Sequence, residues 1–338
     1  MRRLPLTIGL LVAVLAIPGA PSPRAAASQM TVIRFASLAP QGSPFMKILK
    51  AWSRTLREET SGRVDLRIYG GGSQGDERDY IRKMRAGQLD GAGVSTRGLG
   101  MLARPVLVLA APGVITDYAG LEQVQHRMNA KFEGMLDEAG YQFLGWSTTG
   151  KVRIFSTHPV VAPSDLRKAR PWAWTGDPIF SEFLKTAGAN PVRLALGEVY
   201  TGLQTGMVDT VPCSPVAALA LQWHTRLKYM TDQGHGIALG ATIIKNDKLA
   251  ALSSADRETL VRTGRRAAQL MHELVRRDDE RAYQALLSRG IAELSTSAHK
   301  AAWESVGEQT RERLVGRLYS RSLLEQVRRV ASGEAYVR

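Results

Sequence analysis

The sequence predicts an α/β protein, and three observations lead to this prediction. Between Asp165 and Pro215, patterns typical of strand, helix, strand, helix and strand follow one another. A second alternation of the same kind occupies residues 31–95. At 338 residues the chain is long enough for two medium cores. Alternating strands and helices are typical of a parallel sheet with helices on its faces.

The first alternation begins with an apolar strand that ends at Pro40. A helix follows over residues 42–62, because apolar side chains recur there at intervals of three and four and Gly62 ends the pattern. Residues 63–70 alternate as a strand, and a second helix spans about 76–86. A short strand after it completes the unit.

The middle of the chain contains the longest predicted strand. An apolar segment turns at Pro112-Gly113, and a helix is expected from about Tyr118 to Ala139. Residues 140–157 then read as one strand. In the second alternation, Asp177 or Gly176 caps a helix that has Pro178 in its first turn.

The C-terminal third is predicted to be mainly helical. Residues 217–232 read as a helix and residues 235–246 as a returning strand. From Ser253 or Ser254 a helical pattern continues to about Arg289, which corresponds to a rod of roughly 54 Å. Two further helices begin near Ser297 and Arg321.

Residues 1–27 have the pattern of a secretory signal peptide. Arg2 and Arg3 precede an apolar stretch, and three alanines before Ser28 form a small-residue cleavage site. An N-terminal membrane anchor is the alternative reading. The sequence has a single cysteine, Cys213, which excludes a disulfide within the chain. We therefore expect an exported, soluble protein in an oxidising compartment.

The chain is strongly basic. Removing Arg2, Arg3 and Arg24 with the signal peptide lowers the net charge from +14 to +11. Many of these charges lie on the C-terminal helices, where acidic residues alternate with them, as on solvated helix faces. No nucleic-acid-binding motif accompanies them.

No motif indicates catalysis or a metal site. The six histidines contain no pair at i,i+4, and the glycine run 70–75 lacks the Lys-Ser/Thr ending of a phosphate loop. Asp76, Glu77 and Asp79 have the position of first-turn helix charges. We expect no cofactor, and a binding protein is favoured over a secreted enzyme or adaptor.

The segments DLRKAR (165–170), GANPV (188–192) and EVYTGLQTGMVD (198–209) resemble the signature of the solute-binding subunit of tripartite ATP-independent periplasmic (TRAP) transporters. The likeness extends to ASLAP and to DERDYIRKMRAGQLD (76–90) in the first half. It implies a two-lobed fold of the type II periplasmic-binding-protein kind, with crossing hinge strands and a long spine helix. In that fold the segment 104–110 would be a strand beside the cleft.

The resemblance also implies a division of the chain. The expected parts are listed here: the signal peptide (1–27), lobe I (28–146 with about 235–260), lobe II (147–234), a helix spanning both lobes (about 253–289) and C-terminal helices (290–338).

At the positions where the family binds its ligand, this sequence departs from the pattern. Counting the motif from Asp165 places Trp172 where the family has an arginine that pairs with a ligand carboxylate. The position of a second family arginine falls on Val152, and that of an asparagine on Cys213, with Ser214 next to it. All three polar anchors of the family are thus replaced.

Two readings of this departure remain open. In the first, the polar residues with which the family binds a ligand carboxylate are lost. An apolar cleft is then lined by Trp172, Trp174, Val152, Trp146 and Cys213. In the second, a shifted register leaves Arg153 or Arg170 to supply the positive charge; Arg170, Trp172 and Trp174 share one face of a strand.

The resemblance implies a receptor that delivers a small molecule to integral-membrane TRAP permease subunits. We favour a hydrophobic or amphipathic ligand, because burying an unpaired carboxylate is costly. Relatives that lack the arginine are associated with a tetratricopeptide-repeat partner. The alternatives are an ordinary organic-acid receptor and a secreted receptor that serves a sensor.

Overall fold

The computed structural model describes residues 30–334, so the predicted signal peptide lies outside the described residues. In this part of the chain the main sheet has eight strands, in the order β10-β8-β4-β9-β3-β1-β2, with β7 also paired to β4. The strands are β1 (Thr31–Ala36), β2 (Val64–Tyr69), β3 (Gly91–Ser95), β4 (Tyr141–Ser156), β7 (Thr210–Cys213), β8 (Tyr229–Thr231), β9 (Gly236–Lys245) and β10 (Ala292–Leu294). A two-stranded sheet joins β5 (Trp172–Trp174) to β6 (Val192–Leu194).

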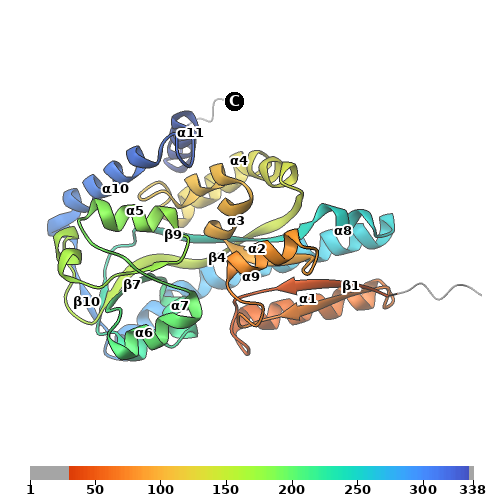
Figure 1. The fold of residues 1–338 in the computed structure, drawn as a ribbon, viewed down its shortest axis with the longest axis horizontal. Coiled ribbons are helices and arrows are strands. Elements are labelled where there is room, and N and C mark those ends of the chain that lie inside the picture. Colours follow the sequence, from red (N-terminus) through yellow and green to blue (C-terminus); the bar gives the residue numbers. More distant parts are fainter. Residues whose placement is uncertain (1–29, 335–338) are drawn as a thin grey trace, which may run out of the picture.

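The helices flank these sheets (Figure 1). They are α1 (Pro44–Glu59), α2 (Glu77–Arg85), α3 (Thr96–Leu102), α4 (Tyr118–Glu138), α5 (Pro178–Thr186), α6 (Val199–Thr205), α7 (Pro215–Ala220), α8 (Asn246–Ala250), α9 (Ser254–Ser288), α10 (Lys300–Leu314) and α11 (Arg321–Ala331). In the view of Figure 1, α4, α10 and α11 lie along the upper side, and α1, α6 and α7 along the lower side.

The predicted α/β class is confirmed, and the sheet is mixed. β1 pairs in parallel with β2 and β3, as the first alternation predicts. β9, however, runs antiparallel to both β3 and β4. The antiparallel pairing arises because β4 and β9 cross the molecule in opposite directions.

β4 and β9 connect two groups of apolar clusters. Tyr141, Phe143 and Leu144 of β4 pack in the clusters that contain α1 and α4. Further along the same strand, Ile154 and Phe155 pack in clusters with α5, β7 and α6. These are the two lobes of the predicted fold, and β4 passes from one to the other. The residue boundaries given above for the lobes stay a prediction.

The long helix α9 is confirmed at Ser254–Ser288. The hydroxyl of Ser253 caps it by accepting a hydrogen bond from the backbone N–H of Asp256 at 3.1 Å. Gly264 lies where α9 packs closely against the first lobe. A Cβ atom at this position would come within 2.6 Å of Leu144 Cδ1 and 2.9 Å of Trp52 Cζ2.

We expect Gly264→Ala to lower the free energy of unfolding by about 1–2 kcal/mol, because the overlap outweighs the gain in helix propensity. Urea denaturation measures the change. Gly134→Ala in α4 is the matched control, since no atom lies within 4 Å of its Cβ position. That control should gain up to about 1 kcal/mol. A similar gain in both variants would contradict the close packing at Gly264.

Two segments differ from the prediction. Residues Arg104–Ala110 form the 3-10 helix η1 instead of a strand; Pro105 offers no N–H to a sheet, and Val106 donates back to the carbonyl of Ala103. The helix predicted over residues 217–232 ends at Ala220, because Gln222 has a left-handed backbone with φ of 61°. The rest of that segment includes β8.

Candidate functional site

A cavity of about 410 Å³ lies between the lobes. Its wall comes from α3, η1 and β9 on one side and from β5, α5, and the junction of β7 with α7 on the other. Apolar side chains dominate this wall, and they include Leu107, Leu109, Ile115, Phe180 and Phe183. The volume is in the range of small-molecule binding sites.

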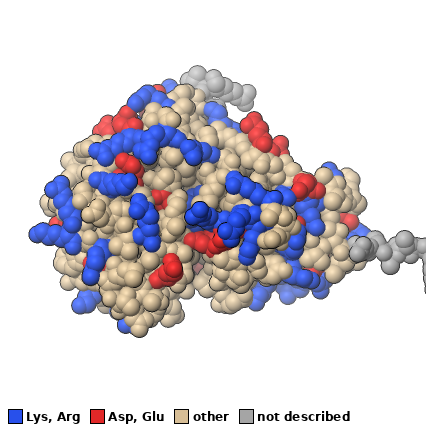
Figure 2. Space-filling model, viewed as in Figure 1, with Lys and Arg blue, Asp and Glu red and all other residues tan. Residues whose placement is uncertain are grey.

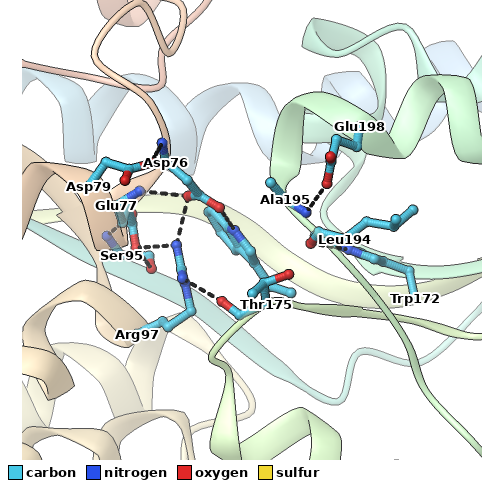
Figure 3. Close-up of polar contacts among 11 residues, drawn as sticks. Asp76, Glu77, Asp79, Ser95, Arg97, Trp172, Thr175, Leu194, Ala195 and Glu198 are labelled. Atoms are coloured by element: carbon cyan, nitrogen blue, oxygen red, sulfur yellow. Dashed lines mark hydrogen bonds and ion pairs between the residues drawn. The ribbon is translucent and has the colours of Figure 1, made fainter.

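Five of the residues singled out from the sequence line the cavity: Trp172, Trp174, Val152, Cys213 and Ser214. Trp172 is 4 % exposed, and its ring meets that of Trp223 edge to face with centroids 5.3 Å apart. Its Nε1–H donates to the carbonyl oxygen of Leu194 at 3.0 Å (Figure 3). The indole therefore contributes apolar surface to the cavity, because its single donor is already used.

Cys213 and Ser214 are held by local structure. Ser214 caps α7 by accepting a hydrogen bond from the N–H of Ala217 at 3.2 Å, and its hydroxyl donates to the carbonyl oxygen of Thr149. Burial raises the pKa of the Cys213 thiol. At neutral pH the thiol is protonated, and it behaves as a small apolar group.

The other three residues lie outside the cavity wall. Arg153 donates to the carbonyl oxygen of Thr231 at 2.8 Å, and its guanidinium lies 4.2 Å from the ring centre of Tyr283. The side chain of Arg170 is 60 % exposed and pairs with Asp209 at 3.0 Å. The Nε1–H of Trp146 donates to Asn129 Oδ1 at 2.7 Å.

The sequence analysis missed Arg97, which is the only Lys or Arg among the described residues of the cavity wall. Its side chain is 5 % exposed and begins in the first turn of α3. Nη2 pairs with Asp76 Oδ1 at 2.8 Å and with Glu77 Oε2 at 3.2 Å. Two carboxylates therefore compensate the one cation of the cavity.

Arg97 also connects the two lobes (Figure 3). Its Nη1 donates to the carbonyl oxygen of Thr175 at 2.7 Å, and its guanidinium lies 4.1 Å from the ring centre of Trp174. The Nε1–H of Trp174 in turn donates to Asp76 Oδ2 at 2.7 Å. We call Asp76, Arg97, Trp174 and Thr175 the interlobe cluster.

Local structure positions the acidic side of this cluster. Asp76 is the N-cap of α2, at the helix start that the sequence predicted for it. Its carboxylate also pairs with Arg97. Glu77 accepts hydrogen bonds from the N–H of Ser95 at 2.6 Å and from its hydroxyl at 2.7 Å. Burial raises the pKa of Glu77, although the charge of Arg97 acts to lower it.

Two further ionisable groups of the wall, His235 and Asp177, add no positive charge at pH 7. Burial lowers the pKa of His235 to about 4, so the imidazole is neutral at pH 7. Its ring packs on Trp303 with centroids 4.7 Å apart. Asp177 caps α5 through the N–H groups of Ile179 and Phe180, and burial raises its pKa.

The spine helix contacts the point where β4 crosses between the lobes. Asp279 of α9 accepts hydrogen bonds from the N–H of Lys151 at 3.0 Å and from the Tyr118 hydroxyl at 2.9 Å. Here the pairing of β4 with β9 shifts by one residue between Thr148 and Gly150. Gly150 has φ of +110°, and a Cβ would lie 2.3 Å from Asp279 Oδ1.

The family model described as "Bacterial extracellular solute-binding protein, family 7" (DctP) matches residues 35–315. The chain belongs to this family. Members of the family are binding proteins for transport, and the resemblance to the solute-binding subunit of TRAP transporters is confirmed.

Relatives of this family 7 chain are distant in sequence. A solute-binding protein of Chromohalobacter salexigens is 24% identical over 254 residues, which cover 75% of each chain. The C4-dicarboxylate-binding periplasmic protein DctP of Rhodobacter capsulatus is 23% identical over 285 residues, covering 83% of this chain and 85% of its own.

Solved structures confirm the two-lobed fold. A TRAP periplasmic solute-binding protein of Citrobacter koseri with bound D-glucuronate has a TM-score of 0.80 and 23% identity, and covers 88% of this chain and 99% of its own. A second such protein, from Ralstonia eutropha with bound (S)-2-acetolactate, has a TM-score of 0.84 and 19% identity. The match covers 90% of this chain and 99% of that protein. At this level of identity the likeness concerns the fold alone.

Within residues 30–334, none of the helices combines the length and apolar character needed to cross a membrane. The same residues contain no group of three His, Cys, Asp or Glu side chains that could hold a metal ion.

Proposed function

We propose that this family 7 chain is the receptor for a hydrophobic or amphipathic solute and delivers it to a TRAP-type permease. The proposal rests on the ion pairs that Arg97 makes within the protein. Arg97 is the one Lys or Arg of the described cavity wall, and Asp76 and Glu77 already pair with it. A ligand carboxylate would find no uncompensated cation in this wall, although the Nε–H of Arg97 has no hydrogen-bond partner.

The energetic balance favours an apolar ligand. An unpaired carboxylate loses several kcal/mol when it leaves water. Apolar surface instead gains roughly 25 cal/mol per Å², so a ligand that buries about 300 Å² gains roughly 7 kcal/mol before entropy costs. The wall around Trp172, Val152 and Cys213 supplies such surface.

An organic-acid receptor is the second candidate, because Arg97 does line the cavity. Solved neighbours from Citrobacter koseri and Sulfitobacter contain D-glucuronate and β-D-galacturonate. For this chain to bind such acids, the ligand would have to reach the unpaired Nε–H of Arg97 or displace Asp76 or Glu77 from its other nitrogens. A receptor that serves a sensor remains a further alternative, which the position of the gene beside permease genes would decide.

We expect medium-chain alkanols and fatty acids to bind the mature protein with their polar ends left in water. They should change its tryptophan emission, because Trp172 and Trp174 line the cavity. Succinate and malate should leave the emission unchanged. Native mass spectrometry of the purified protein identifies any ligand that is retained. Micromolar binding of a dicarboxylate, without binding of the apolar compounds, would favour the organic-acid receptor.

The permease subunits, the tetratricopeptide-repeat partner and export through a signal peptide belong to the same proposal. Membership of family 7 supports the permease subunits as partners. The second rests on the absence of the family arginine at Trp172. Fractionation that recovers a processed chain from the periplasm supports the third.

A further inference from the structure

A second hollow, of about 710 Å³, lies beside the cavity and contains five arginines: Arg78, Arg82, Arg85, Arg97 and Arg104. We call it the arginine groove. α2, α3 and η1 form one side of it, and Gly176 and Pro178 at the start of α5 form the other. In Figure 2, Lys and Arg side chains gather over α2 in the middle of the face shown. The groove is therefore a basic surface to which both lobes contribute.

Most of the positive charge in the arginine groove is uncompensated. Among residues 30–334, Arg78, Arg85 and Arg104 have no carboxylate partner within 4.0 Å. Arg85 and Arg104 donate only to backbone carbonyl oxygens. The other two arginines pair with acids: Arg82 with Asp79 at 2.9 Å, and Arg97 with Asp76 and Glu77. Three exposed guanidinium groups are therefore available to an anionic partner.

The arginine groove and the cavity share part of one wall. Arg97 and Leu107 line both. The Nε–H of Arg97 is buried and has no hydrogen-bond partner, although the other nitrogens of the same guanidinium bind Asp76 and Thr175. A buried donor without a partner is unusual, and a carboxylate would satisfy it.

We propose that the arginine groove binds an acidic, partly apolar segment of a partner protein, and that a carboxylate of this segment competes with Asp76 for Arg97. Apolar side chains of Met101, Leu102 and Leu318 line the groove between the arginines. This combination fits a narrow chain that carries both acidic and apolar residues. A flat lipid surface would reach the protruding arginines but not this recessed lining.

The proposal links binding in the arginine groove to the cleft. When Arg97 turns toward the partner, it leaves Asp76 and the carbonyl oxygen of Thr175, which lie in different lobes. The lobes then lose a direct contact, and the cavity opens at that side. The inference does not depend on which ligand occupies the cavity.

Binding is tested with a fluorescent synthetic peptide of alternating Glu and Leu, by anisotropy at physiological salt. The groove variant carries Arg78→Gln, Arg85→Gln and Arg104→Gln. The control carries Arg54→Gln, Arg67→Gln and Arg193→Gln, three exposed arginines elsewhere that change the net charge equally. We expect the groove variant to bind roughly tenfold more weakly than the control. Equal weakening in both, or binding to phosphatidylglycerol vesicles with none to the peptide, would overturn the proposal.

The effect on the cleft has its own measurement. Spin labels on Gln88→Cys and Lys185→Cys, both exposed and on opposite sides of the cleft, report the distance between the lobes. Saturating Glu-Leu peptide should lengthen this distance in the wild-type protein and leave the groove variant unchanged. A distance that stays constant while the peptide is bound would show that the groove does not act on Arg97.

Discussion

Replacing Arg97 with methionine is expected to lower the free energy of unfolding by about 3–5 kcal/mol, because the change leaves two buried carboxylates without their cation. The side chains of Asp76 and Glu77 are both largely buried. Methionine keeps much of the length of the arginine side chain. The decrease in unfolding free energy therefore reflects the removed charge more than the removed volume. Urea denaturation gives the free energy, and the spin-label pair described above should show a longer distance between the lobes.

Arg170→Met is the matched control for this experiment. Arg170 also pairs with an aspartate, Asp209, but its side chain is 60 % exposed. Its loss should cost less than about 1 kcal/mol. Similar losses in the two variants would show that Arg97 contributes no more than an ordinary surface ion pair.

The loss of unfolding free energy in Arg97→Met, relative to the wild type, should become smaller as the pH falls. Burial raises the pKa of Glu77, and Arg97 acts against this rise. Without Arg97 the native pKa of Glu77 rises further above its unfolded value, so the native state binds a proton more readily than the unfolded state. Stability relative to wild type is therefore regained as the pH falls through the raised pKa of Glu77. A deficit that is constant with pH would argue against a buried charge as its cause.

Trp172→Ala is expected to weaken binding of an apolar ligand by about 2–4 kcal/mol, as truncation of a buried aromatic anchor does. The indole is almost fully buried and meets the rings of Trp174 and Trp223. Its removal deletes apolar wall and loosens its neighbours. Titration with the fatty acid or alkanol that binds best measures the loss, under conditions in which the variant is folded.

Trp146→Ala provides the comparison, because Trp146 packs against Phe132 and Phe143 outside the cavity wall. Its ligand affinity should stay within a few-fold of wild type. If instead succinate or malate bound, and Arg153→Ala or Arg170→Ala abolished that binding while Trp172→Ala did not, the motif count would be wrong and the chain would be an ordinary organic-acid receptor.

Local signals predicted much of the fold. The cap at Ser253 and the uninterrupted helical pattern after it predicted α9 to within two residues at each end. The segment 104–110 was misassigned because an apolar run of this length suits a strand or a buried 3-10 turn equally. The break after Ala220 depends on the left-handed conformation of Gln222, a residue with no strong preference for it.

Some residues of the candidate site could be predicted from the sequence, and others could not. The motif spacing led to Trp172, Val152 and Cys213, and the structure places these three in the cavity wall; their role in binding stays a prediction. Arg97 had no comparable signal, because its contacts come from Asp76 in its own lobe and Thr175 in the other. A contact that forms only when two lobes meet has no spacing in the sequence that could reveal it.

The hydrogen bond between Asp279 and β4 fixes the spine helix to the strand that crosses between the lobes. It holds the irregular part of β4 at Gly150 and Lys151 against α9, and we expect rotation of one lobe relative to the other to have its pivot there. In a rotation, displacement grows with distance from the pivot. Ser214, which is bonded to Thr149 beside that point, should therefore stay nearly in place, whereas Arg97 and Thr175 should separate. On this expectation the base of the cavity keeps its shape while its rim opens, and a ligand would enter a pocket whose innermost surface is already formed.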